Sequence, residues 1–307
     1  MRTGHRGTLL VSLDFELLWG LRAHREPDAC YEQVANTRIA IPRILELLAG
    51  YNVHATWGAV GFLFLQDWEQ LLDFLPERRP RYEREELSPY RYIERVAQDR
   101  PNPELHFAPD LIERIAGTDH QEIATHTFSH YYCCEPGHAP EAFEADLEKA
   151  FEAAALHDLR PTSIIFPRNQ VDEACLAICA RHGITAFRGV PPGWVWRPRT
   201  EGRRDRAASA VRFLDDNIAL TGHNCYSLDD LAPDLPCDLR ESRHLRPLRD
   251  GRRVFQSIRL RLRRIIRSME YAAEHGLCYH LWWHPHDFGL RSEEKLRGLE
   301  VVLAHYR

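Results

Sequence analysis

No Cys-x-x-Cys pair occurs among the eight cysteines of this 307-residue chain, and no apolar stretch is long enough to cross a membrane. The first apolar run, Leu9-Leu10-Val11, is interrupted by Asp14 and Glu16 before any cleavage site, so it does not read as a signal peptide. The sequence contains no visible internal repeat. Scattered thiols without a disulfide framework suit a reducing compartment, and we therefore expect a cytoplasmic protein without membrane insertion.

Positive charge is not in excess either. The 40 lysines and arginines are outnumbered by 45 aspartates and glutamates, for a formal net charge of −5. We therefore do not expect bulk attraction to nucleic acid or to an anionic membrane to be the main function. Hydrophobic residues make up 44% of the chain and charged residues 28%, as in ordinary globular enzymes. This length fits either one large α/β barrel or two medium domains.

Short apolar runs alternate with helical patterns along the chain, and this alternation predicts a parallel α/β sheet or barrel. Besides a first strand beginning at Thr8, strands are expected at residues 53–58, 122–125, 163–166, 184–188 and 277–283, and helices at residues 31–49, 110–116, 140–156 and 172–182. The segment from Leu63 to Pro109 is rich in charged residues and proline, and we expect an insertion with short helices there. Residues 189–250 are poorly periodic and are expected to form long loops.

Two acids end the first predicted strand. Asp14 and Glu16 point the same way if the strand persists, because side chains alternate with period two. Carboxylates at the carboxyl end of a barrel strand lie where active sites are built. A solvated strand end is the alternative interpretation.

Two histidines follow another predicted strand. If the chain turns helical after Thr125, His126 and His130 lie on one helix face, where two imidazoles can bind one divalent cation. The chain has 17 histidines, and His280 and His284 repeat the same spacing, so the spacing alone is weak evidence against ordinary surface or core histidines.

Two further strand ends carry polar side chains. Arg168 follows the strand predicted at 163–166, and His284 and His286 follow the strand predicted at 277–283. Because the carboxyl ends of parallel strands meet at one mouth, four such strand ends together point to a shared site.

In their order along the chain, these motifs resemble those of the polysaccharide deacetylase superfamily (NodB homology, carbohydrate esterase 4). The resemblance rests on residues 12–16 (Ser-Leu-Asp-Phe-Glu), 55–58 (Ala-Thr-Trp-Gly), 126–130 (His-Thr-Phe-Ser-His), 166–169 (Phe-Pro-Arg-Asn) and 281–284 (Leu-Trp-Trp-His). It implies an α/β fold, a distorted (β/α)7-type barrel. A single catalytic domain would span residues 1–307, with long insertions near 63–109 and 190–270.

The resemblance also implies a divalent metal, most often zinc, bound by one carboxylate and two histidines. His126 and His130 match the histidine ligands. The family usually has two adjacent aspartates, of which the second binds the metal, whereas Phe15 occupies that position here. Glu16 is therefore assigned as the third ligand and Asp14 as the general base, with Asp14 as the ligand being the alternative.

Other roles follow from the same resemblance. Arg168 is expected to pair with Asp14 and keep it ionised. His284 would protonate the departing amine, and His286 is the alternative for that role. Asn169 and Trp283 are assigned to substrate binding. The acid that orients the catalytic histidine has no clear match, and by position alone Asp215 and Asp216 are candidates.

The expected activity is metal-dependent removal of an N-acetyl group from an N-acetylated sugar, whether a precursor, a glycoside or an oligosaccharide. The arginine-rich stretch from Arg259 to Arg267 would suit a phosphate-linked substrate, or is simply the solvated face of an amphipathic helix. One alternative is a C–N hydrolase of small amides or ureides, as in the allantoinase-like branch. Another is a non-catalytic sugar-binding homologue. An open groove lined by Trp19, Trp194 or Trp283 would favour sugars, and a small closed pocket would favour ureides.

Overall fold

The computed structural model describes residues 7–23, 25–201, 205–215, 220–232, 234, 236–246 and 258–307. The strands are β1 (Thr8–Phe15), β2 (Ala55–Ala59), β3 (Gln121–Thr125), β4 (Ser163–Ile164), β5 (Ala186–Phe187), β6 (Cys237–Asp238), β7 (Arg243–His244) and β8 (Cys278–Trp283). The α-helices are α1 (Pro27–Gly50), α2 (Trp68–Phe74), α3 (Pro89–Val96), α4 (Pro109–Ala116), α5 (Pro140–Ala155), α6 (Glu173–Arg181), α7 (Arg206–Asp215), α8 (Ile258–His275) and α9 (Ser292–Tyr306).

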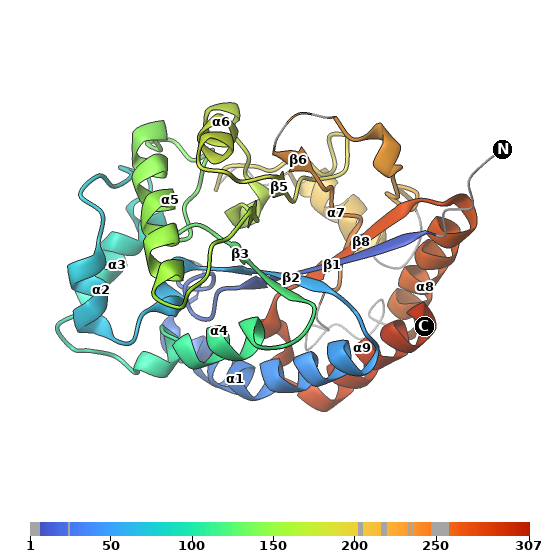
Figure 1. Ribbon diagram of the computed structural model, residues 1–307, viewed down its shortest axis with the longest axis horizontal. Coiled ribbons are helices and arrows are strands. Elements are labelled where there is room, and N and C mark those ends of the chain that lie inside the picture. Colours follow the sequence, from blue (N-terminus) through green and yellow to red (C-terminus); the bar gives the residue numbers. More distant parts are fainter. Residues whose placement is uncertain are drawn as a thin grey trace.

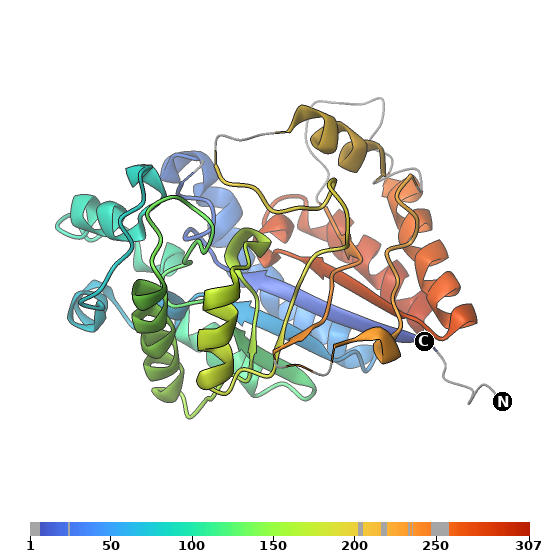
Figure 2. The same ribbon diagram turned by 90° about the horizontal axis from the view of Figure 1, so that it is seen from above.

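These strands form one curled parallel sheet in the order β6-β5-β4-β3-β2-β1-β8-β7. Helices surround it, with α1, α4 and α9 on one side and α5 and α6 on another (Figures 1 and 2). A parallel sheet covered by helices needs strands that are apolar on both faces, as the run Leu9-Leu10-Val11 of β1 is. The prediction of an α/β barrel of the (β/α)7 type is confirmed.

One extended segment, residues 237–245, joins the two edges of the sheet. Its backbone amides donate first toward β5 and then toward β8: from Cys237, Leu239 and Glu241 to the carbonyls of Thr185, Phe187 and Gly189, and from Ser242 and Leu245 to those of His280 and Trp282. The strands β6 and β7 are thus successive halves of one segment, which makes seven strands around the barrel. The expectation of long loops throughout residues 189–250 misses both this closing segment and helix α7.

Helix α1 shows how the sequence pattern produces the outer layer. Five of its apolar residues recur at a helical spacing and are buried: Val34, Ile41, Ile44, Leu45 and Leu48. The helix begins with Pro27, whose fixed φ suits the first helical turn, and ends at Gly50. The predicted helix is therefore confirmed, with four more residues at its start.

The segment from Leu63 to Pro109 forms the expected short helices, α2 and α3. Asp67 and Ser88 cap these helices by accepting from the backbone amides of residues 70 and 91. The segment is fixed to the end of β1 by Trp19, which is fully buried. Its indole nitrogen donates to the carbonyl oxygen of His106 (2.7 Å), and its ring contacts that of Trp68. The segment therefore packs directly behind the residues that follow β1.

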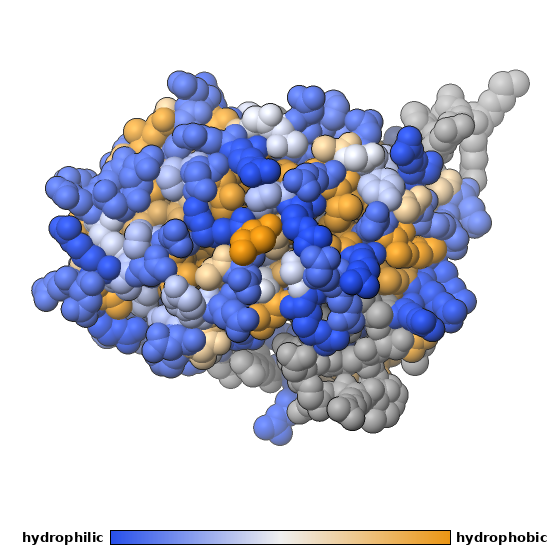
Figure 3. All heavy atoms as spheres, turned by 90° about the horizontal axis from the view of Figure 1, so that it is seen from below, coloured by the Kyte–Doolittle hydropathy of each residue, from blue (hydrophilic) through white to orange (hydrophobic). Residues whose placement is uncertain are grey.

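Hydrophobic side chains on the face shown in Figure 3 are interspersed with hydrophilic ones. Exposed apolar residues such as Ile39, which is 67% exposed, are normal on a protein surface when they occur singly. Among the described helices, none combines the length and the apolar character that crossing a membrane would require.

A close contact between the 3₁₀-helix after β2 (Gly61–Phe64) and the loop after β3 gives a prediction for stability. A Cβ atom at Gly61 would lie 2.6 Å from Cδ2 and 2.7 Å from Cα of Phe128. Gly61→Ala should therefore displace the chain between the two histidines and lower the free energy of unfolding by about 1–3 kcal/mol. Gly50→Ala is the matched control, because a Cβ there meets no atom within 4 Å. It should raise stability by up to about 1 kcal/mol. Urea unfolding of both variants tests this, and equal stabilities would contradict it.

Candidate active site

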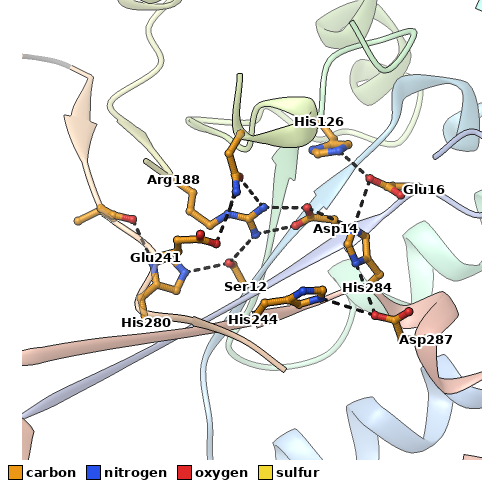
Figure 4. Close-up of polar contacts among 12 residues, drawn as sticks. Ser12, Asp14, Glu16, His126, Arg188, Glu241, His244, His280, His284 and Asp287 are labelled. Atoms are coloured by element: carbon orange, nitrogen blue, oxygen red, sulfur yellow. Dashed lines mark hydrogen bonds and ion pairs between the residues drawn. The ribbon is translucent and has the colours of Figure 1, made fainter. Parts of the chain in front are cut away.

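Side chains from the carboxyl ends of β1, β3 and β8 converge at one end of the barrel (Figure 4). Asp14 lies in β1, Glu16 follows it, His126 follows β3 and His284 follows β8. The parallel register brings these ends together, since Phe15 of β1 pairs with Ala59 of β2, and Ala59 pairs with Thr125 of β3. Four of the predicted site residues therefore share one mouth.

The carboxylate of Glu16 lies close to both His126 and His130. Its Oε1 atom lies 3.1 Å from Nε2 of His126 and 3.1 Å from Nε2 of His130, and all three residues are buried. Three tetrahedral ligand atoms about 2.0–2.1 Å from a zinc ion would be separated by about 3.3 Å. Two imidazoles and one carboxylate are also a donor set that zinc prefers. The three residues therefore fit a divalent cation.

Burial would by itself raise the pKa of the Glu16 carboxyl. The imidazoles of His284, His126 and His130 reverse this effect and hold the pKa well below its usual value. Burial also lowers the pKa of His130 to about 4, because desolvation outweighs the attraction of Glu16. An ionised carboxylate and a neutral imidazole are the forms that bind a metal.

The histidines do not lie on a helix, contrary to the geometry proposed from their spacing. Residues 126–132 form an irregular loop, in which Thr127 and His130 have φ of 61° and 60°. Positive φ is uncommon for residues other than glycine, and it here turns both rings toward Glu16. The two imidazoles therefore meet through loop geometry.

Asp146 of α5 holds this loop in place. Its carboxylate accepts hydrogen bonds from the backbone amides of Phe128 (2.7 Å) and Ser129 (3.3 Å) and from the hydroxyl groups of Ser129 and Tyr90. Asp146 is fully buried, and burial raises its pKa to about 6. A buried carboxylate thus replaces the regular backbone hydrogen bonds that a helix would supply.

Asp14 pairs with Arg188 and not with Arg168. Two parallel hydrogen bonds join the guanidinium to the carboxylate, NH1 to Oδ1 at 2.6 Å and NH2 to Oδ2 at 2.8 Å. Although burial would raise the pKa of Asp14, Arg188 lowers it below its usual value. The expectation for Arg168 is wrong because Arg168 ends a different strand and points elsewhere. It pairs with Glu201 (2.7 Å) and Glu135 (3.6 Å).

Asn169 and Ser12 fix the position of Arg188. The amide oxygen of Asn169 accepts from Nε (3.3 Å) and NH2 (3.0 Å) of the guanidinium, and Ser12 Oγ accepts from NH1 (3.1 Å). Ser12 in turn lies 2.8 Å from Nε2 of His280, whose Nδ1 lies 3.0 Å from the carbonyl of Leu239. The amide oxygen of Asn169, a residue assigned to the substrate, is thus engaged by Arg188.

Trp283 does not contact the site. It is 0% exposed and packs in the main hydrophobic core, so the expectation that it binds substrate is wrong. Its neighbour Trp282 faces the barrel interior, because side chains of a strand alternate. The Trp282 ring stacks on His244 at 4.1 Å between centroids and lies 4.1 Å from the Arg188 guanidinium carbon.

His284 stands between the two carboxylates and a third acid. Its Nε2 is 3.8 Å from Asp14 Oδ2 and 3.8 Å from Glu16 Oε1, and its Nδ1 is 3.6 Å from Asp287 Oδ2. Burial would lower the pKa of His284, but the three carboxylates raise it to about 9. His286, the alternative acid, lies 3.9 Å from Glu16.

Asp215, one of the two candidates named for orienting the catalytic histidine, pairs with another residue. Asp215 is fully buried and pairs with Arg243 (2.6 Å), and Asp216 lies outside the described residues. Asp287 is the acid next to His284, three residues further along the chain.

Four residues near the site were missed from the sequence: Arg188, His244, Asp287 and Glu241. Arg188 directly follows the short strand β5, just as Arg168 closely follows β4, so its position was a usable signal. Asp287 follows the His-Pro-His run after β8. His244 and Glu241 lie in the closing segment, where two-residue strands leave too short a pattern to detect.

By its fold and site, this protein is an α/β barrel that carries a cluster of histidines and carboxylates at its strand ends. The family model for polysaccharide deacetylases matches residues 28–187, which is more than half of the chain. The chain therefore belongs to the polysaccharide deacetylase family. The matched range contains His126 and His130, whereas Glu16 precedes it and His284 follows it.

Two solved structures share the fold over almost the whole chain. One is a protein from Mycobacterium smegmatis that is provisionally described as a polysaccharide deacetylase, with 13% identity and a TM-score of 0.60, covering 99% of this chain and 86% of its own. The other is the Puue allantoinase, with 12% identity and a TM-score of 0.57, covering 100% of this chain and 87% of its own. Among curated proteins, none matches the sequence. At such identities the likeness concerns the fold alone.

Measurements of metal binding can test whether Glu16, His126 and His130 are the metal ligands. Glu16→Gln should weaken binding of the first equivalent of Co²⁺ by more than the roughly 10- to 100-fold typical for loss of an outer-shell partner. Asp14→Asn is the control and should leave that binding unchanged, because both Asp14 oxygens are engaged by Arg188. Titration followed by visible absorption measures both, and a larger effect of Asp14→Asn would make Asp14 the ligand.

Removing Arg188 should give a pH-dependent loss of stability in metal-free protein. In the wild type, Arg188 lowers the folded-state pKa of Asp14, so the pair stabilises the fold above the unfolded pKa, about 3.9, and this contribution is lost as pH falls through the folded value. In Arg188→Met, burial instead raises that pKa. The variant should lose about 3–5 kcal/mol near pH 7, and the difference should shrink toward pH 4.

Urea unfolding between pH 4 and pH 8, with a chelator present, measures this difference. Arg91→Met is the matched control, because Arg91 makes only surface ion pairs with Glu85 and Glu94. It should cost about 0–1 kcal/mol. A loss in Arg188→Met that is independent of pH would contradict the role of the Asp14 charge.

Proposed function

We propose that this protein is a divalent-metal-dependent hydrolase that removes the acetyl group from an N-acetylated sugar. The observation that carries the proposal is the convergence of Glu16, His126 and His130 beside Asp14 and His284. Membership of the polysaccharide deacetylase family supports the same reaction. Non-catalytic sugar binding is disfavoured, because acid, base and candidate metal ligands are all present.

Glu16, His126 and His130 would hold the metal, most suitably Zn²⁺. When bound, it would polarise the amide carbonyl and lower the pKa of a water molecule. Asp14 remains free of this set because Arg188 engages both of its oxygens. We assign Glu16 as the ligand carboxylate because Asp14 is paired with Arg188, whereas Glu16 faces the two histidines.

Asp14 would act as the general base. A general base must be ionised and must lie within reach of the water whose proton it accepts. Arg188 keeps the Asp14 carboxylate ionised, and each carboxylate oxygen retains a further lone pair for that proton. Ser12 and Asn169 act as positioning residues through their hydrogen bonds to Arg188.

His284 would be the general acid. Its raised pKa, about 9, keeps the imidazole protonated at neutral pH, and a cation bound at Glu16 would oppose part of this shift. Asp287 faces Nδ1, so Nε2 is the atom that points toward Asp14 and Glu16 and would donate to the departing amine. His286 is less suited to donate, because the positive charge of His284 and its own burial lower its pKa.

The substrate would be a precursor handled in the cytoplasm. The eight cysteines are all free thiols, which suits a reducing compartment. On α8, the side chains of Arg259, Arg263 and Arg267 are exposed and available for a phosphate-linked substrate. Arg264 is buried beside Ser268 and cannot contribute.

Hydrolysis of a small amide or ureide is a second candidate that two observations favour. Trp19 and Trp283 are both fully buried in the core, so neither can line a sugar-binding groove. Among the three tryptophans considered for that purpose, only Trp194 is exposed, at 52%. The ligand set is itself deeply buried, with His126 at 0% and Glu16 at 5% exposure. A small substrate reaches such a site more readily than a polymer does.

Release of acetate tests the leading proposal. Protein supplied with Zn²⁺ or Co²⁺ should release acetate from N-acetylated sugars, including phosphate-linked ones, and an enzymatic acetate assay measures the rate. Asp14→Asn and His284→Gln should each lower kcat by about 10²- to 10⁴-fold, because each removes a proton-transfer group. Trp283→Phe is the control for a change in the core and should affect stability more than rate.

Allantoin and related ureides serve as the comparison substrates. Turnover of a ureide with no acetate from any sugar would favour the second candidate. No turnover of either class by metal-loaded protein would contradict both.

A further inference from the structure

A second cluster of metal-ligating side chains lies on the other side of His284. It consists of His244 in β7, His284 after β8 and Asp287 in the 3₁₀-helix Pro285–Phe288. Asp287 Oδ2 is 3.6 Å from His284 Nδ1 and 3.7 Å from His244 Nε2. One ligand atom from each of the three residues lies within 4.8 Å of the others. The cluster uses the face of His284 that points away from Glu16.

Two of the atoms that face one another here lack a hydrogen bond within the described part of the chain. Asp287 Oδ2 and His244 Nε2 are both buried and have no hydrogen-bond partner among the described residues, although they lie 3.7 Å apart. Distances of 3.6–3.7 Å are too long for an N–H···O bond. A buried carboxylate oxygen left without a partner carries a large desolvation cost, so this group calls for an explanation.

The same distances suit a shared cation. Ligand atoms about 2.0–2.1 Å from one ion, at angles of about 110–120°, are separated by about 3.3–3.6 Å. Two imidazole nitrogens and one carboxylate oxygen again form the donor set that zinc prefers. Asp287 therefore already lies at a suitable distance from each imidazole, and the two imidazole ligand atoms, which lie within 4.8 Å of each other, would approach the ion as it binds.

The frame around His244 limits how far its ring can move. The ring is stacked on Trp282 with 4.1 Å between centroids and an interplanar angle of 12°. Trp282 is itself packed against the Arg188 guanidinium at 4.1 Å. A ligand held by stacking loses little conformational freedom when it binds a metal.

The distribution of charge also distinguishes this cluster from the pair formed by Asp14. Arg188 neutralises Asp14, whereas within the described residues the ion pairs of Glu16 and Asp287 involve histidines only. In that part of the chain, these two carboxylates thus pair with imidazoles and not with a guanidinium or ammonium group. Each is placed to bind a divalent ion.

We propose that His244, His284 and Asp287 form a second divalent-cation site, and that filling it inhibits the enzyme. The inhibitory part rests on the proposed function. His284 Nδ1 cannot bind a cation and carry a proton at the same time, so a bound ion displaces that proton to solvent. His284 is then no longer an imidazolium and cannot protonate the departing amine. The protein would need one ion at Glu16 and be inhibited by excess metal.

Zinc binding to the full chain tests the site directly. Isothermal titration and metal analysis of the wild type should give a tight equivalent and a weaker second one. His244→Ala should lose the second and keep the first. His126→Ala should lose the first and keep the second. His120→Ala is the control for adventitious binding, because His120 is exposed at the start of β3, and it should lose neither.

Activity provides a separate readout. In the wild type, filling the second site should lower the rate by about 10²-fold or more, the usual contribution of a general acid. The same zinc excess should have little effect on the remaining activity of His244→Ala, relative to that variant at one equivalent. A single equivalent at saturating zinc, or a second equivalent that survives in His244→Ala, would overturn the proposal. Binding of two zinc equivalents without any turnover would support the second site and contradict the proposed enzymatic function.

Discussion

The structure depends on how two neighbouring carboxylates at the end of β1 are kept charged inside the barrel. Asp14 and Glu16 are 3% and 5% exposed, and a buried charge is costly unless it has its own partner. The fold supplies the two partners separately. Arg188 from the end of β5 engages Asp14, and the imidazoles of His126 and His130 engage Glu16. Other polar residues hold these partners in place: Ser12 and Asn169 position Arg188, and Asp146 holds the loop that carries the two histidines.

The division between the acids also separates their chemistry. A carboxylate fixed by a guanidinium remains ionised and keeps lone pairs available for a proton, whereas a carboxylate that faces two imidazoles is arranged to bind a cation. Phe15 lies between the two acids, is fully buried and packs against Trp57. Side chains alternate along a strand, so the sequence Asp-Phe-Glu directs Phe15 into the core and both acids into the mouth of the barrel.

Much of this arrangement could be predicted from the sequence, because it follows from strand ends. Asp14, Glu16, His126 and His284 each lie at the end of, or directly after, an apolar run that the structure confirms as a strand, and His130 follows His126 by four residues. What failed were inferences that needed tertiary contacts. Arg168 was assigned by motif, but the parallel neighbour that reaches Asp14 is Arg188. Trp283, expected to bind substrate, lies in the core, whereas Trp282 lies beside Arg188, because alternation along β8 sends adjacent side chains to opposite faces. The loop that carries the histidines depends on Asp146, a residue of α5 with no local signal.

The segment of residues 237–245 has a consequence for the mechanical behaviour of the barrel. This segment closes the cylinder, and we call it the seam. Among the described strands, its first half, β6, is hydrogen-bonded only to β5, and its second half, β7, only to β8, so neither half has a paired strand on both sides. A parting of this seam would uncouple β5 from β8 while leaving the six other strands paired. Because Glu241 and His244 belong to the seam, and Arg188 lies just beyond β5, the line along which the cylinder closes runs through the mouth that holds the candidate site.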